Sequence, residues 1–198
     1  MRRILAEALA AAEVPMVAPL RLQGRTLHRH NDFLFSVSPA RGGRRPELDD
    51  PEVLEWIGRL LARLHQVGTA RPFEQRPALD AQTFGSEPLA WLLEQGDLPP
   101  EAAGRWREMA QAALTLATEA MTACAPQGRI ATLRLHGDCH PGNILWTPDQ
   151  GPHFVDLDDS RSGPAVQDLW MLLSGDAPAM ARQLDHVLEG YEQFADFD

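Results

Sequence analysis

Apolar residues recur at three- and four-residue steps over residues 51–68, a spacing that places them on one face of a helix. Asp49-Asp50-Pro51 opens this stretch with acidic caps and a proline in the first turn, and Gly68 closes it. The apolar face consists of Leu54, Ile57, Leu61, Leu64 and Val67. The pattern predicts a helix that packs this face into a core.

Other stretches carry helical patterns, and short apolar runs between them predict strands. The expected helices are residues 3–13, 87–95, 100–124, 164–174 and 177–195. The expected strands are residues 17–22, 25–28, 33–37, 131–135 and 153–157, with a Gln23-Gly24 turn between the first two. Residues 71–85 carry several prolines and are expected to cross the surface. Residues 39–46 break all periodicity and form the best linker candidate.

Composition narrows the class of protein. The 198 residues are 44% hydrophobic, and no apolar run reaches the roughly 18 residues of a membrane span. A net charge of −10 disfavours binding to a nucleic-acid backbone. The two cysteines, Cys124 and Cys139, define no disulfide framework. Because Glu7 and Glu13 interrupt the apolar run that a signal peptide needs, we expect a cytoplasmic protein.

The candidate chemistry lies in residues 135–146 and 154–159. The first stretch crowds Asp138 and Asn143 between two apolar runs, and the second is a hydrophobic strand that ends in Asp156. Carboxylate and amide oxygens suit a hard cation such as Mg²⁺, which completes its shell with water and substrate phosphates. A separate Asp can orient a hydroxyl and accept its proton during phosphoryl transfer.

Three other interpretations of these residues remain open on the sequence. His136-Gly137-Asp138-Cys139-His140 could bind zinc as a His-x-Asp-x-His cluster. Cys139 beside a histidine could be a nucleophile. Asp138 and Asn143 could also simply cap a tight turn.

Residues 136–143, read as His-Gly-Asp-Cys-His-Pro-Gly-Asn, resemble the catalytic loop of the aminoglycoside phosphotransferase and choline kinase superfamily, relatives of the protein kinases. Val155-Asp156 resembles the metal-binding strand end of that superfamily. The longer sequence segments 133–140, 154–159 and 163–173 are similar to those of a group of bacterial stress-response kinases within that superfamily. The resemblance implies an α+β, protein-kinase-like two-lobe fold. It divides the chain into a small-lobe remnant (1–38), a hinge (39–50) and a mostly helical large lobe (51–198).

Roles carried over from the resemblance make Asp138 the catalytic base. Asn143 and Asp156 would be Mg²⁺ ligands, and Asp156, counted with Asp138 as catalytic, would bridge the metal to the ATP phosphates. His136 and Asp168 would structure the catalytic loop, while His65 would pack in the core. The hinge would bind adenine through its backbone, so no adenine-binding side chain is named.

The resemblance fails in the part that clamps phosphates. Such kinases use a glycine-rich loop, a strand lysine and a helix glutamate, yet this sequence contains no lysine and nothing before Val14 resembles the loop. We therefore expect a chain truncated at both ends, weakly active and weakly bound to Mg·ATP by itself. Missing strands would also leave apolar surface exposed and favour association.

The function implied for the intact protein is ATP- and Mg²⁺-dependent phosphoryl transfer to a Ser or Thr hydroxyl of a protein. One competing hypothesis is a kinase of small hydroxyl compounds, such as an amino alcohol or an aminoglycoside-like sugar. The other is a pseudokinase that binds partners without catalysis. Neither nucleic acid nor a membrane is expected among the partners.

Overall fold

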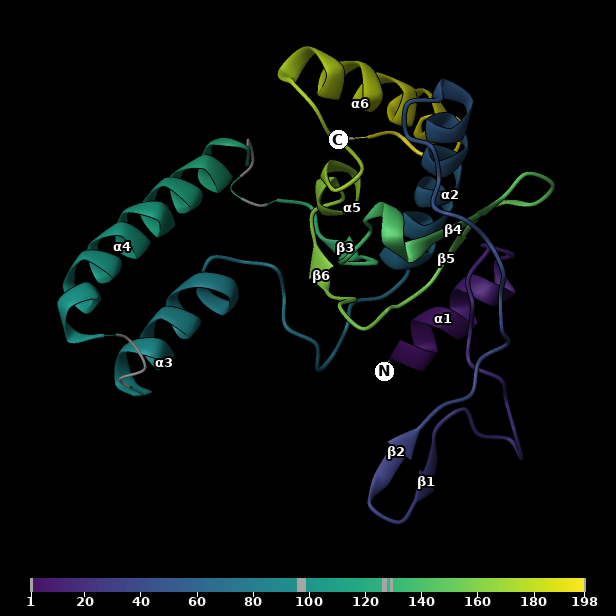
Figure 1. Cartoon of the computed structure of the whole chain (residues 1–198), viewed down its shortest axis with the longest axis horizontal. Coiled ribbons are helices and arrows are strands. Elements are labelled where there is room, and N and C mark those ends of the chain that lie inside the picture. The colour runs from purple at the N-terminus through teal and green to yellow at the C-terminus, as the bar shows by residue number, and fades with distance from the viewer. Residues whose placement is uncertain (1, 96–98, 126–127, 129, 198) are drawn as a thin grey trace.

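The computed structural model describes residues 2–95, 99–125, 128 and 130–197. Its helices are α1 (Arg2–Ala11), α2 (Pro51–Thr69), α3 (Glu87–Gln95), α4 (Pro100–Ala123), α5 (Val166–Trp170) and α6 (Ala177–Tyr191), with one π-helical turn at Gln82–Ser86 and one 3₁₀ turn at Pro141–Asn143. Figure 1 shows α1, α2, α5 and α6 gathered in one body, while α3 and α4 form an arm beside it. Every predicted helix is present, although α5 and α6 are shorter than expected.

Helix α2 forms the centre of the body, as its apolar face predicts. Leu54, Ile57, Leu61 and Leu64 are buried in a core that also receives Leu5 and Leu9 from α1 and Val187 from α6, whereas Val67 is only partly buried. Asp50 caps the helix, because its side chain accepts a hydrogen bond from the Glu52 backbone N–H at 3.0 Å.

Gly68 does not end α2, contrary to the prediction, since the helix continues to Thr69. A Cβ at Gly68 would overlap the carbonyl oxygen of Arg134. This glycine therefore lets the helix lie against the following strand instead of terminating it.

The strands form three small antiparallel pairs. They join β1 (His28–His30) to β2 (Phe33–Phe35), β3 (Leu133–Arg134) to β6 (Ser162–Gly163), and β4 (Ile144–Thr147) to β5 (Gly151–Phe154). The predicted strands 33–37, 131–135 and 153–157 are only partly correct, and residues 17–22 and 25–28 do not form the expected strands. The turn at Gln23-Gly24 is confirmed, because Leu22 and Arg25 exchange backbone hydrogen bonds across it.

The linker lies against β4. Arg44 and Trp146 exchange backbone hydrogen bonds of 2.9 and 2.7 Å, and Gly43 packs on Leu145 with no room for a side chain. Although residues 39–46 contain no helix or strand, they are therefore fixed to the strand that begins directly after Asn143.

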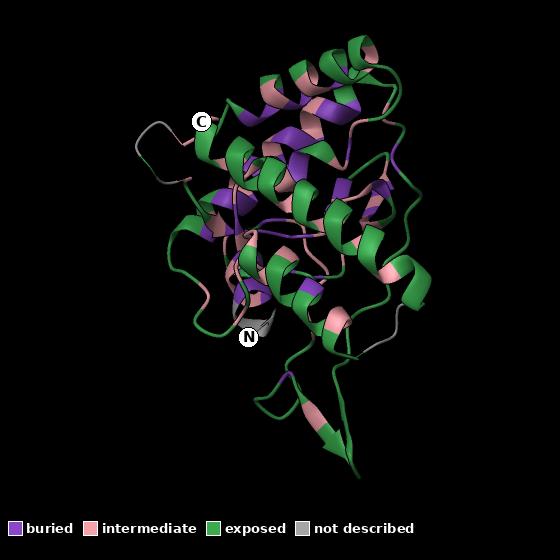
Figure 2. Cartoon of the chain, turned by 90° about the vertical axis from the view of Figure 1, so that its left-hand side faces the viewer, coloured by how far each residue is buried: buried purple, intermediate pink, exposed green. Residues whose placement is uncertain are grey.

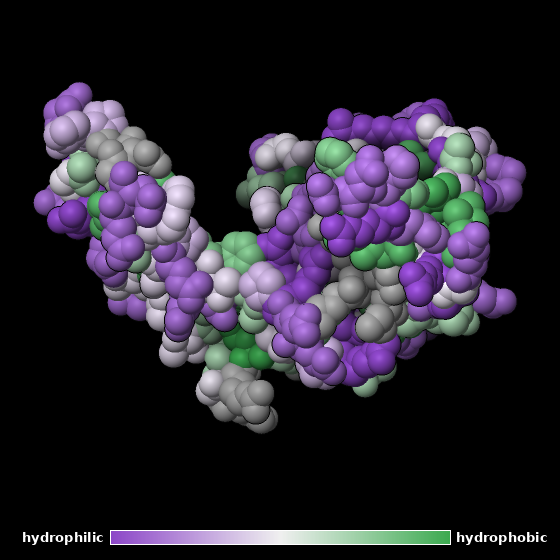
Figure 3. Space-filling view, turned by 90° about the horizontal axis from the view of Figure 1, so that it is seen from below, coloured by the Kyte–Doolittle hydropathy of each residue, from purple (hydrophilic) through white to green (hydrophobic). Residues whose placement is uncertain are grey.

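The hairpin and the arm both leave large apolar side chains exposed. The hairpin of β1 and β2 exposes Phe33, Leu34 and Phe35, and it extends away from the body. The arm exposes Met109 and Leu116 of α4, a helix with no fully buried residue in its length (Figure 2). Figure 3 shows the surface hollowed between arm and body. Among the described residues, no helix has the length and hydropathy needed to cross a membrane.

Candidate active site

Asp138 and Asn143 lie together on the loop between β3 and β4. The Asn143 side-chain amide donates to the backbone oxygen of Asp138 at 2.9 Å and to its carboxylate oxygen Oδ2 at 3.0 Å. Because the NH₂ group faces Asp138, the Asn143 carbonyl Oδ1 points the other way. An amide held in this orientation presents an oxygen that could bind a cation.

Asp156 stands immediately beyond a pair of hydrogen bonds that join its strand to this loop. The Val155 N–H donates to the Asn143 carbonyl at 3.0 Å, and the Val155 carbonyl accepts from the His136 ring Nε2 at 2.8 Å. Asp156 is exposed and has a left-handed φ of 60°, and its Oδ1 accepts from the Asp158 N–H at 3.1 Å. The structure thus ties the residue before Asp156 to the loop that carries Asp138 and Asn143.

Asp168 is buried beneath the loop and binds its backbone. Its two carboxylate oxygens accept from the N–H groups of His136 and Gly137, each at 2.8 Å. Gly137 has a φ of 89°, and a Cβ there would overlap the carbonyl oxygen of Asp159, so a side chain is excluded. Both oxygens of the buried carboxylate therefore accept hydrogen bonds, as a buried charged group requires.

A further hydrogen-bond chain runs from Asp168 into the core. The His65 ring donates from Nε2 to Asp168 Oδ2 at 3.1 Å, because a carboxylate can only accept, and its Nδ1 then accepts from the Tyr191 hydroxyl at 2.9 Å. Burial, followed by the charge of Asp168, raises the pKa of Tyr191 to about 12, so this hydroxyl keeps its proton. His65 is a core residue, as expected.

The structure disfavours both a Cys139 nucleophile and a zinc cluster. Cys139 is fully buried, and burial together with the charges of Asp168 and Asp138 raises the pKa of its thiol well above the usual value, so it is no nucleophile. The His136 ring is engaged with Val155 at Nε2 and with the Asp138 N–H at Nδ1, while His140 uses Nδ1 for the Gly142 N–H. Because both ring nitrogens of His136 are engaged, a zinc ion bound by this cluster would have to break one of its hydrogen bonds.

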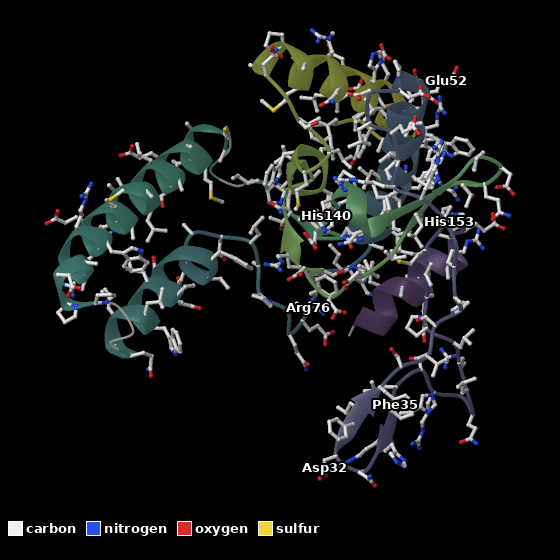
Figure 4. The ribbon with its side chains drawn as sticks, viewed as in Figure 1. Asp32, Phe35, Glu52, Arg76, His140 and His153 are labelled. Atoms are coloured by element: carbon white, nitrogen blue, oxygen red, sulfur yellow. The ribbon has the colours of Figure 1, made fainter. Side chains whose placement is uncertain are left out.

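Arg76 supports the candidate site, and sequence analysis did not identify it. Its guanidinium donates to the carbonyl oxygens of Asp158 and Ser160 at 2.7 and 2.5 Å, which fixes the loop that follows Asp156 (Figure 4). Residues 71–85 show no periodicity, so no local signal identified this arginine. Its partners lie more than eighty positions away, at separations of 82 and 84 residues.

Comparison with known proteins agrees with this architecture. The family model described as "Phosphotransferase enzyme family" matches residues 1–198. The chain is 45% identical over 190 residues to "Stress response kinase A" of Salmonella choleraesuis, covering 96% of this chain and 56% of that protein. "Serine/threonine protein kinase RdoA" of Salmonella typhimurium gives the same identity and coverage. The chain thus spans about half the length of the curated relatives it matches.

Among solved structures, amicoumacin kinase hAmiN in complex with AMP-PNP, Ca²⁺ and Ami superposes with a TM-score of 0.72 at 18% identity, covering all of this chain and 62% of that one. At this identity the similarity shows the fold, and the expected α+β, protein-kinase-like fold is confirmed. The resemblance to stress-response kinases seen in the sequence is confirmed as well. The chain belongs to the phosphotransferase enzyme family.

Proposed function

We propose that the protein is an ATP- and Mg²⁺-dependent serine/threonine protein kinase, and that this chain supplies its base and its metal ligands. The observation that carries the proposal is the bonded pair of Asp138 and Asn143, with Asp156 held beside them through Val155. Because the chain spans 56% of its first relatives, the proposal concerns the activity of the intact protein.

Asn143 and Asp156 would hold the metal ion. Both offer oxygen donors, the Asn143 oxygen is turned away from Asp138, and Asp156 is exposed, which fits the preference of Mg²⁺ for a few protein oxygens. Mg²⁺ bound there would neutralise part of the negative charge on the ATP phosphates. Asp168 keeps the loop rigid from below, so the two ligands need little rearrangement to bind.

Asp138 would orient the acceptor hydroxyl and take its proton. The hydroxyl oxygen forms a bond to the γ-phosphorus of ATP, the bond from that phosphorus to the bridging oxygen breaks, and ADP leaves with the electron pair. The hydroxyl proton passes to the Asp138 carboxylate, which later releases it to water. The products are therefore ADP and a phosphate monoester of the acceptor.

The same proposal assigns the parts of the chain. Residues 1–38 would belong to the nucleotide-binding lobe, residues 39–50 to the hinge and residues 51–198 to the helical lobe. Backbone pairing of Arg44 with Trp146 supports a hinge seated at the catalytic loop, where adenine would meet the linker backbone. Use of ATP and two unpaired cysteines, Cys124 and Cys139, support a cytoplasmic location.

The acceptor distinguishes two candidate activities. A protein Ser or Thr is supported by the name of the RdoA relative, at 45% identity. A small hydroxyl compound is supported by the fold of the amicoumacin kinase and by the net charge of −10, which suits a cationic acceptor. A pseudokinase, the third candidate, would transfer phosphate to neither acceptor. Phosphate transfer from labelled ATP to protein, compared with transfer to a panel of amino alcohols and aminoglycosides, separates the three.

Asp138→Asn in the intact protein should lower kcat by about 10²–10⁴-fold, because the base is lost while its shape is kept. Nucleotide affinity should change little. The measurement is steady-state phosphate transfer combined with calorimetric ATP binding. Asp185→Asn, the same exchange on an exposed position of α6, serves as the control. Wild-type turnover by the Asp138 variant would show that another group is the base.

Asp156→Ala should abolish the dependence of nucleotide binding on Mg²⁺. The measurement is ATP affinity by calorimetry with and without the metal. A variant that still gains affinity from Mg²⁺ would rule out Asp156 as a ligand.

This chain by itself should bind Mg·ATP weakly, and micromolar affinity would contradict that expectation.

A further inference from the structure

His140 is fixed on the candidate catalytic loop by its own ring. It precedes the 3₁₀ turn Pro141–Asn143, and its Nδ1 accepts the Gly142 backbone N–H at 2.9 Å. A ring nitrogen that accepts a hydrogen bond carries no proton, so the proton of the neutral ring resides on Nε2. The capping bond therefore decides both the orientation of the ring and its tautomer.

The protonated nitrogen faces Asp138. His140 Nε2 lies 3.6 Å from Asp138 Oδ2, the same oxygen that accepts from the Asn143 amide at 3.0 Å. Among the described residues, none donates a hydrogen bond to the other oxygen, Oδ1. The N–H groups of His140 and Asn143 thus both face Oδ2 of Asp138, whereas Oδ1 has no hydrogen-bond donor among the described residues.

This asymmetry matters because a carboxylate rotates easily about its Cβ–Cγ bond. A base that rotates presents the acceptor hydroxyl with a lone pair in varying directions, and misplacement by about 1 Å can cost on the order of 10²-fold in rate. The 3.6 Å separation exceeds a direct hydrogen bond, but catalytic contacts of this kind shorten when substrate closes the site.

We propose that His140 is a positioning residue for the base: its Nε2–H, together with the Asn143 amide, holds Oδ2 of Asp138 so that Oδ1 faces the acceptor hydroxyl. The inference rests on the proposed function of Asp138. It adds to that function a second task for His140, distinct from capping the 3₁₀ turn.

Two substitutions separate capping from positioning. His140→Asn keeps an acceptor where Nδ1 stands, and Asn is a good cap, but it removes the donor that reaches Asp138. His140→Gln keeps a donor amide at the distance of Nε2 and removes the cap. His186→Asn, the same exchange at a histidine of α6, serves as the control.

In the intact protein, His140→Asn should keep the wild-type Tm and lose about 10- to 100-fold in kcat, with KM for ATP within about twofold. His140→Gln should show the opposite pattern, a lower Tm with most of kcat retained. His140→Asn with wild-type kcat would overturn the proposal and leave His140 as a cap only.

A readout independent of turnover keeps this test separate from that of the proposed function. The NMR signals of the Asn143 side-chain NH₂ report the position of Asp138 Oδ2, because that group donates to it. They should shift in His140→Asn and stay in His186→Asn. If the signals shift while the wild type transfers no phosphate, His140 still orients the Asp138 carboxylate, but the kinase proposal falls and with it the catalytic purpose of that orientation. Unshifted signals would overturn the positioning role whether or not the protein is a kinase.

Discussion

At the scale of single residues, the hydroxyl of Tyr191 offers a direct measure of the buried network. Tyr191 is the one tyrosine of the chain, so its phenolate absorbance reports this site alone. Burial, and then the charge of Asp168, raises its pKa to about 12 from an ordinary value of 10.0. The pKa of Tyr191 is higher in the folded chain than in the unfolded chain. The contribution of Tyr191 to the free energy of unfolding is therefore complete below pH 10 and is lost as the pH rises through about 12.

Absorbance titration of the native chain should therefore give a midpoint near 12, and titration in denaturant one near 10. Tyr191→Phe should abolish the phenolate signal in both conditions. A native midpoint near 10 would mean that the hydroxyl is not buried beside Asp168 as the structure has it.

The two cysteines should differ sharply in reactivity. Cys124 is exposed, whereas Cys139 is buried and its thiol pKa is raised well above the usual value by burial and by the charges of Asp168 and Asp138. Because the thiolate is the reactive form, a thiol reagent should label Cys124 quickly and Cys139 only after denaturation. Mass spectrometry of the labelled native chain checks this. Rapid native labelling of a Cys124→Ser variant would contradict the burial of Cys139.

At the scale of secondary-structure elements, two glycines determine how closely α2 and α6 pack. A Cβ at Gly190 would overlap the carbonyl oxygen of Glu55, and one at Gly58 would overlap that of Val187. Each helix therefore meets the other backbone at a position without a side chain. This contact brings Tyr191, at the end of α6, within reach of His65 on α2.

Gly190→Ala should lower the free energy of unfolding by about 1–3 kcal/mol or more, because backbone atoms must move to admit the methyl group. Gly104→Ala on α4 is the matched control, since nothing lies within 4 Å of the added carbon. It should be neutral or stabilising by up to about 1 kcal/mol, the ordinary gain of alanine over glycine in a helix. Urea denaturation measures both. Equal effects would show that the two helices do not cross so closely.

At the scale of the whole molecule, the body and the arm differ in how they are held. The core cluster contains side chains of α1, α2 and α6, and within the described residues it includes none from α3 or α4. The arm relies on contacts of its own, such as the packing of Leu114 on Gly85, and on Leu89 as its buried residue. Figures 1 and 3 show the arm set apart from the body.

Amide hydrogen exchange should therefore open α4 at a lower free energy than α2, since few buried contacts resist its local unfolding. Mass spectrometry of peptides from residues 100–123 and 51–69 provides the comparison. Equal protection of the two helices would mean that the arm and the body unfold as one unit.

The sequence by itself predicted the helices well and the strands poorly. Periodic apolar residues are a local signal, which is why α2, α3 and α4 begin within a residue or two of the predicted positions. The strands span between two and four residues, which is too short for an alternating pattern to be recognised. In addition, β3 pairs with β6 nearly thirty positions away, so no local signal indicates their pairing. The resemblance of the loop also gave the family and the fold, which the comparisons confirm.

For the site, the division follows separation along the chain. Asp138 and Asn143 stand five positions apart, so the sequence could place them on one loop, and their hydrogen bond forms within it. Asp168 binds that loop from 31 and 32 positions away, and Tyr191 reaches His65 across 126. The sequence determined which groups can do chemistry and which helix faces are apolar. Only the tertiary structure decided which distant groups meet, because that depends on how closely helices pack and not on local periodicity.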